Sequence, residues 1–209
     1  MKQIILALDT SQGTSVAVLV DGKVLVESAD PNPMRHAENI GTLIASCIEK
    51  AGVSSAEVTD VAVGIGPGPF TGLRVGIAAA KMFAAGSKAR LHGVGSLDAI
   101  AFKLPLTEPT LVVADARRSE VYFGLYQAKS RNGVPKALLV PGVSKQAELE
   151  TRLQAQGQDY ALISEPVAAA AVGLLALAQQ SEGYSAGPIQ ANYLREPDAK
   201  FANPKKVSG

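Results

Sequence analysis

The order of apolar segments in the first part of the chain is the feature that most constrains its fold. Residues 4–8 and 15–19 are short apolar runs with the length and composition of buried strands. Asp21-Gly22 follows the second run and predicts a tight β-hairpin, with residues 23–27 as the returning strand. The chain is therefore expected to begin with three consecutive strands.

A helix, a strand and a second helix are predicted after this hairpin. From Ile40, apolar residues recur at the spacing of one helix face, and Gly52 stands where a helix C-terminal glycine is common. Residues 61–65 form another buried run, and residues 73–85 predict a second helix that ends at Gly86. The order βββαβα is typical of an α/β lobe of the actin-like (ribonuclease H-type) fold, in which a hairpin extends a parallel pair.

The periodic pattern lapses near residues 103–109, where Pro105 and Pro109 indicate a junction between two lobes. We therefore predict a first lobe over residues 1–105 and a smaller second lobe with the C-terminal segment over residues 106–209. In the second lobe, strands are expected over residues 110–114, 120–126 and 137–140, and helices over residues 145–156 and 166–180. Pro166 is expected in the first turn of the last helix.

Charge and residue counts exclude several classes of protein. Twenty Lys and Arg face nineteen Asp and Glu, so the basic excess expected of a stand-alone tRNA binder is missing. The only support for a tRNA-binding module is a group of three lysines near the terminus. Solvent-exposed lysines of a polar tail are the simpler explanation of this group, which comprises Lys200, Lys205 and Lys206. The single cysteine excludes an intrachain disulfide and fits a reducing compartment.

The N-terminus and the longest apolar run predict a cytoplasmic protein with no membrane association. The first residues lead directly into a strand pattern without signal-peptide features, and residues 167–178 are too short to cross a bilayer. A metal site is not expected either, because Ile40 occupies the position one helical turn after His36 where a second ligand would stand.

Two motifs are candidates for a phosphate site, now vestigial, across a cleft between the lobes. Asp9-Thr10-Ser11 ends the first strand, where a carboxylate and nearby turn amides can hold a metal-bound phosphate. A turn that satisfies its own backbone explains the same residues. Three residues mark the equivalent turn of the second lobe: Asp115, Arg117 and Arg118. These arginines can recognise an acidic group, or they can simply pair with neighbouring acids.

The loop from Gly66 to Gly72 enters the second predicted helix and resembles a phosphate cradle. Pro67 and Pro69 each remove an amide donor, and the lysine of a Walker loop is missing. The sequence therefore favours a rigid connector that fixes the following helix.

That helix carries small residues at every fourth position: Gly72, Gly76, Ala80 and Ala84. Such a ridge permits close packing of another helix, either from the same lobe or from a partner. We interpret it as facing outward, beside the helix that contains Ile40. Gly76→Leu or Ala80→Leu is then expected to abolish pairing while the monomer stays folded.

Taken together, these motifs resemble those of the TsaB family, also called YeaZ. The similarity extends from about Ile4 to Arg195, and Pro69 departs from it because the family usually has serine there. The matching segments are Asp9-Thr10-Ser11, residues 66–74, Ser96-Leu97, residues 115–122 and Tyr193-Leu194-Arg195. The resemblance implies the actin-like (ASKHA) fold with a reduced second lobe.

The resemblance also implies a non-catalytic subunit. Family members pair with TsaD, which transfers a threonylcarbamoyl group to the tRNA adenosine next to the anticodon, and an ATPase, TsaE, joins the pair. A homodimer is implied for the isolated chain. No tightly bound cofactor is implied, ATP or ADP is expected only within the complex, and tRNA is reached only through it.

The interface helices that the resemblance implies cover residues 36–50 and 71–85. The interface residues carried over are His36, Ile40, Leu43, Ile44, Cys47, Gly72, Leu73, Gly76, Ala80 and Phe83. The alternative is an actin-like ATP-binding enzyme: a small kinase, an ATPase or a peptidase-like hydrolase. That alternative rests on Asp9-Thr10-Ser11 and the glycine-rich loop.

Overall fold

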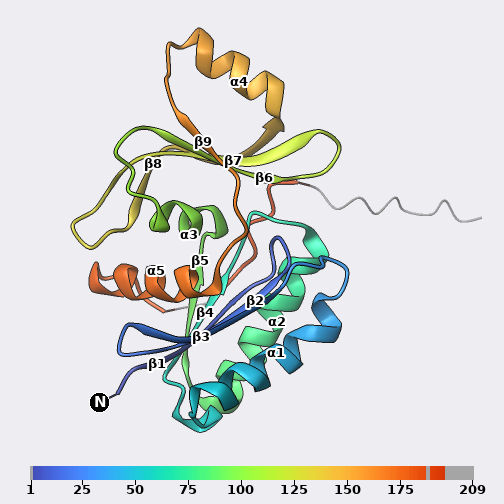
Figure 1. The fold of residues 1–209 in the computed structure, drawn as a ribbon, viewed down its shortest axis with the longest axis vertical. Coiled ribbons are helices and arrows are strands. Elements are labelled where there is room, and N and C mark those ends of the chain that lie inside the picture. The colour runs from blue at the N-terminus through green and yellow to red at the C-terminus, as the bar shows by residue number, and fades with distance from the viewer. Residues whose placement is uncertain (1, 187–188, 196–209) are drawn as a thin grey trace, which may run out of the picture.

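Two β-sheets with helices between and outside them form the protein, shown in Figure 1 as a computed structural model that describes residues 2–186 and 189–195. The first-lobe elements are β1 (Ile4–Asp9), β2 (Thr14–Val20), β3 (Lys23–Asp30), α1 (His36–Ala51), a 3-10 turn (Ser55–Glu57), β4 (Asp60–Gly64), α2 (Phe70–Ser87), β5 (Arg90–Val94) and α3 (Ser96–Lys103). The remaining elements are β6 (Thr110–Asp115), β7 (Glu120–Lys129), β8 (Pro135–Lys145), α4 (Gln146–Ala155), β9 (Ala161–Ile163) and α5 (Ala169–Ser181).

The five-stranded sheet has the order β3-β2-β1-β4-β5. β1 pairs with β2 in antiparallel and with β4 in parallel orientation, and β4 pairs with β5 in parallel. Asp21 and Gly22 both have positive φ, as a two-residue hairpin turn requires. The predicted order of three strands, a helix, a strand and a helix is therefore correct.

Helices cover both faces of this sheet. α1 and α2 pack on one face, and α5 packs on the other against β1, β2 and β4 (Figure 1). β1 is buried on both faces because its alternate residues serve different cores: Leu6 and Leu8 face α1 and α2, and Ile5 and Ala7 face α5.

The second sheet has the order β8-β7-β6-β9, with α3 against one face and α4 on the other side. The expected strands and helices of this region are present. The sequence patterns did not predict four elements: the 3-10 turn, β5, α3 and β9. Two helix ends also differ. α2 continues past Gly86 to Ser87 and is followed by Lys88 in the left-handed conformation, and α5 begins three residues after Pro166.

α5 ties the two lobes into one continuous core, which the predicted boundary at residue 105 does not anticipate. The helix is rich in alanine and leucine on every side, so it requires apolar cover all round. Gly173 lets it approach the first sheet closely, since an added Cβ would lie 2.6 Å from Leu19. Within residues 2–186 and 189–195, no helix combines the length and apolarity needed to cross a bilayer.

Candidate functional site

The cleft between the lobes brings part of the predicted phosphate site together. A cavity of about 350 Å³ is lined by Ser11 and Gln12 after β1, by Asp115 at the end of β6 and by Arg117 in the turn that follows. Glu165 also lines it, so two carboxylates and one arginine carry its charge. A phosphate would meet a net negative wall in this arrangement.

Asp9 does not line this cavity, and both oxygens of its carboxylate accept hydrogen bonds from other residues of the chain. Its Oδ1 accepts hydrogen bonds from the Ser11 amide at 2.7 Å and the Ser11 hydroxyl at 2.6 Å, and its Oδ2 accepts one from the Ser96 hydroxyl at 2.7 Å. Burial raises the pKa of the Asp9 carboxyl, while these bonds oppose the shift. Gly64 leaves the required room, since a Cβ there would lie 1.8 Å from Asp9 Oδ2. Asp9 therefore ties the end of β1 to the first residue of α3.

Thr10 is fully buried and is also engaged within the chain. Its hydroxyl donates to the Gly72 carbonyl at 2.8 Å, which ties the end of β1 to the first turn of α2. Of the three residues of the motif, only Ser11 lines the cleft. The turn explanation of Asp9-Thr10-Ser11 agrees better with these contacts than a metal-phosphate site does.

The turn between β6 and β7 is shaped by its own contacts. The Arg117 amide donates to Asp115 Oδ1 at 2.8 Å, and the Arg117 guanidinium lies 3.5 Å from Asp115 Oδ2. Arg117, Arg118 and Ser119 all have positive φ, a costly conformation for residues with a Cβ. Arg195 contacts both sides of this turn. Its guanidinium donates a hydrogen bond to the Ala116 carbonyl and forms an ion pair with Glu120 at 3.5 Å.

The glycine-rich loop packs directly on both lobes. The Gly66 amide and carbonyl both bond Ser96, and the Tyr122 hydroxyl donates to the Gly68 carbonyl at 3.4 Å. A Cβ at Gly68 would lie 2.8 Å from the Cβ of Ser11. These contacts hold the loop against both lobes, as expected of a rigid connector.

The small-residue ridge of α2 faces inward, so its interpretation as an outward surface is wrong. An added Cβ would lie 2.5 Å from the Thr10 carbonyl oxygen at Gly72, and 2.2 Å from Thr10 Oγ1 at Gly76. Ala80 is completely buried. The glycines admit the end of β1 and the side chain of His36 from α1, contacts made within the monomer.

Several other predicted interface residues are equally inaccessible from outside. His36, Ile40, Cys47 and Leu73 are buried, because they form the inner face of the α1–α2 layer. Burial lowers the pKa of His36, with the charge of Asp30 opposing, and its Nδ1 lies 2.9 Å from the Thr14 hydroxyl. Leu43, Ile44 and Phe83 are half-buried and remain partly accessible.

The outer faces of α1 and α2 carry a different set of small and apolar side chains. On α1, Ala37, Gly41 and Ala45 are exposed at four-residue spacing. On α2, Ala78 and Met82 are exposed, with 76% of Met82 accessible. We call these five residues the outer helix face. The four-residue spacing of these small residues on α1 is visible in the sequence and could have indicated this face.

Residues 191–195 pack across α2 and the second lobe, contacts that the sequence patterns did not predict. Tyr193 stacks on Phe70 with ring centroids 4.8 Å apart, and Arg74 lies over Phe70 and donates to the Tyr193 hydroxyl at 3.2 Å. With the Arg195 contacts, this segment joins α2 to the turn of the second lobe. Lys200, Lys205 and Lys206 lie outside the described residues.

Metal-ligand geometry can be assessed only for the described part of the chain. There, no group of three or more His, Cys, Asp or Glu side chains is arranged to hold a metal ion.

Comparisons with known proteins agree with this architecture. A family model described as TsaD, tRNA N6-adenosine threonylcarbamoyltransferase, matches residues 32–133. The chain is 37% identical to an uncharacterized protein of Mycobacterium leprae over 94% of its own length, and it spans 56% of that relative. It is 32% identical to the tRNA threonylcarbamoyladenosine biosynthesis protein TsaB of Escherichia coli, over 72% of this chain and 66% of that protein.

Solved structures share the fold. A Pseudomonas aeruginosa protein with similarity to peptidase YEAZ superimposes with a TM-score of 0.78 at 26% identity, covering 92% of this chain and 100% of that one. YeaZ from Pseudomonas aeruginosa gives a TM-score of 0.76 at 24% identity, with the same coverage. The predicted actin-like α/β fold is confirmed, and the chain belongs to the TsaB/YeaZ family.

Proposed function

We propose that this chain is a non-catalytic subunit in the formation of threonylcarbamoyladenosine in tRNA. It would pair with a TsaD-type transferase, which a TsaE-type ATPase joins, and would meet tRNA only through that complex. The observation that carries the non-catalytic role is the state of Asp9: the carboxylate that would serve a nucleotide-bound metal is fully bonded to Ser11 and Ser96. Relatives named as threonylcarbamoyladenosine biosynthesis proteins support the pathway.

The outer helix face is the surface that best suits the partner. α1 and α2 lie side by side on the same face of the first sheet (Figure 1). Small side chains on α1 allow a partner helix to approach closely, and the flexible Met82 can adapt to its shape. We infer that the isolated chain forms a homodimer through the same face, and that ATP or ADP is held only within the complex.

Gly41→Arg should weaken pairing with the TsaD-type subunit at least tenfold, because it places a long charged side chain in a close helix contact. An added Cβ at Gly41 meets no atom within 4 Å, so the monomer should remain folded. The measurement is co-elution with the purified TsaD-type protein, followed by a titration. Ala155→Arg, on the exposed face of α4, is the matched control and should pair normally. Normal pairing by Gly41→Arg would exclude this face.

The competing function is an actin-like ATP-binding enzyme, which Ser11 and Arg117 in the interlobe cavity favour. We expect no binding of Mg-ATP in the interlobe cavity of the isolated chain, because Asp9, the carboxylate expected to hold the metal, is bonded to Ser11 and Ser96 and does not line that cavity. Isothermal titration calorimetry with Mg-ATP tests this. Micromolar binding that Arg117→Ala, in the interlobe cavity, abolishes without unfolding the protein would favour the enzyme instead.

A further inference from the structure

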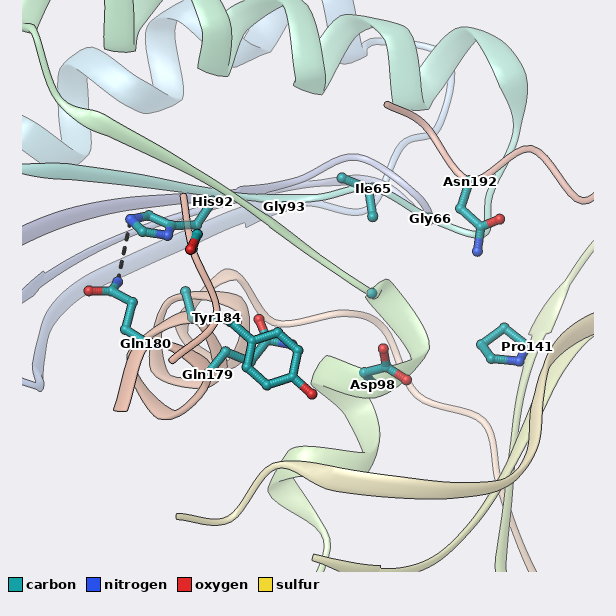
Figure 2. A pocket seen from close by; sticks show the side chains of 13 residues that line it. Ile65, Gly66, His92, Gly93, Asp98, Pro141, Gln179, Gln180, Tyr184 and Asn192 are labelled. Atoms are coloured by element: carbon teal, nitrogen blue, oxygen red, sulfur yellow. Dashed lines mark hydrogen bonds between the residues drawn. The ribbon is translucent and has the colours of Figure 1, made fainter. Parts of the chain in front are cut away.

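Another cavity, of about 340 Å³, lies beside the edge strand β5 and is bordered by α3 and α5. It shares no lining residue with the interlobe cavity. Figure 2 shows His92 and Gln180 at one end and Asn192 with Pro141 at the other, with Tyr184 and Asp98 between them. We call it the α3–α5 pocket. The function proposed above makes no use of it.

Most of the side chains that line the α3–α5 pocket are polar, although Ile65, Pro141 and Ala176 also line it. Carboxamides of Gln179, Gln180 and Asn192 line it, together with the Tyr184 and Ser185 hydroxyls. Among its described lining residues there is no lysine or arginine, whereas Asp98 supplies a carboxylate. Phosphates and carboxylic acids are therefore poor ligands, and a molecule that offers hydrogen-bond donors is favoured.

Asp98 is held in a defined position at the wall of the pocket. It lies in the first turn of α3, and its Oδ1 accepts a hydrogen bond from the Tyr126 hydroxyl at 2.6 Å. Its Oδ2 lies against the Gly95 backbone, where an added Cβ would be only 2.1 Å away. Burial raises the pKa of Asp98, and the Tyr126 bond opposes the shift. The carboxyl group is thus preorganised by its neighbours before any ligand arrives.

His92 is fixed in a similar way at the far end. Its Nε2 lies 2.7 Å from Asp60 Oδ1 and donates to that buried carboxylate. The amide nitrogen of Gln180 lies 3.4 Å from the same ring atom, as the dashed line in Figure 2 marks. The orientation of the His92 ring at this end of the pocket is therefore set by Asp60 of the first sheet.

We propose that the α3–α5 pocket binds an uncharged heterocycle that carries an amino group, of nucleobase or nucleoside size, with the amino group donating to Asp98. The exposed ring of Tyr184 offers a face for stacking, and it is 59% accessible. The carboxamides can match ring nitrogens and carbonyls as donors or acceptors. The volume lies at the lower end of the range for small-molecule sites, which suits a ligand of this size.

The test uses two matched pairs of nucleosides with the full isolated chain, so it is independent of any partner subunit. Adenosine and inosine differ by an amino group in place of an oxo group, as do cytidine and uridine. Amide resonances of Gly93 and Gly95 are followed by NMR during each titration. We expect adenosine or cytidine to shift these resonances saturably. The nucleoside of the same pair that lacks the amino group, inosine or uridine, should bind about tenfold more weakly.

Two variants locate the site. Tyr184→Ala removes an exposed ring and should weaken binding without affecting the fold, and Asp98→Asn should reduce the preference for the amino nucleoside. Asp115→Asn, in the interlobe cavity, is the matched control and should bind normally. The proposal is overturned if none of the four nucleosides shifts the two glycine resonances, if the members of each pair bind equally, or if Asp115→Asn rather than the pocket variants abolishes binding.

Discussion

Gly76→Ala should destabilise the monomer by about 1–3 kcal/mol, although alanine is the better helix former. An added Cβ would lie 2.2 Å from Thr10 Oγ1 and 3.1 Å from Thr10 Cγ2. Thr10 cannot move away cheaply, because it is fully buried and its hydroxyl donates to the Gly72 carbonyl. Urea denaturation measures the free energy of unfolding directly. Gly76→Leu extends the overlap and should leave little folded protein.

Gly86→Ala is the matched control on the same helix. Gly86 lies in the last turn of α2, where an added Cβ meets nothing within 4 Å. Only the gain in helix propensity remains, so Gly86→Ala should be neutral or stabilise by up to about 1 kcal/mol. Opposite signs for the two substitutions are the expected result. An equal gain in stability from both would show that α2 does not pack on Thr10 as described.

The burial of Gly76 changes how a loss of pairing in Gly76→Leu should be interpreted. The sequence interpretation expected that variant to stay folded and fail only to bind its partner. Because Gly76 is buried against the end of β1, lost pairing would follow from an unfolded monomer. Gly41 is the informative position for pairing, since its environment is open.

Local patterns predicted most of the first lobe. The apolar runs of β1, β2 and β4 and the periodic face of α1 depend on neighbours along the chain, so they are readable without the fold. The ridge of α2 could also be predicted, because small residues at every fourth position indicate that another segment packs closely against the helix. The segment that packs against it could not be predicted, because Thr10 precedes Gly72 by 62 residues and only the folded chain brings them together.

β5 escaped prediction for a related reason. Its sequence, Arg-Leu-His-Gly-Val, places two basic side chains on a strand and lacks an apolar pattern. Both side chains are satisfied by Asp60, which lies on the neighbouring strand β4. A strand whose polar residues are partnered only in the folded protein is not recognisable from its own composition. The same holds for Asp9, whose role became clear only through Ser96.

Asp60→Asn should cost about 3 kcal/mol at neutral pH, because it disrupts the polar cluster that joins β4 and β5. Asp60 is completely buried. Its carboxylate lies 2.7 Å from His92 Nε2 and 2.9 Å from Arg90 Nε, and it accepts a hydrogen bond from the Thr59 hydroxyl at 2.8 Å. Asparagine has one acceptor oxygen in place of two, so buried donors would lose their partners. Arg90 is more than half exposed and can return to water, which keeps the cost below that of a fully buried pair.

The pH dependence of stability distinguishes the charge of Asp60 from its shape. Burial alone would raise the pKa of this carboxyl, but the bonds from His92, Arg90, Thr59 and Gln3 outweigh burial and hold the pKa far below its usual value. A lowered folded-state pKa means that the stabilisation is fully present above the unfolded value of about 4, and is lost as pH falls below it. The difference in unfolding free energy between the wild-type protein and Asp60→Asn should therefore shrink as the pH falls below about 4. A difference that stays the same down to pH 3 would contradict this account, because the cluster would then stabilise the sheet through packing alone.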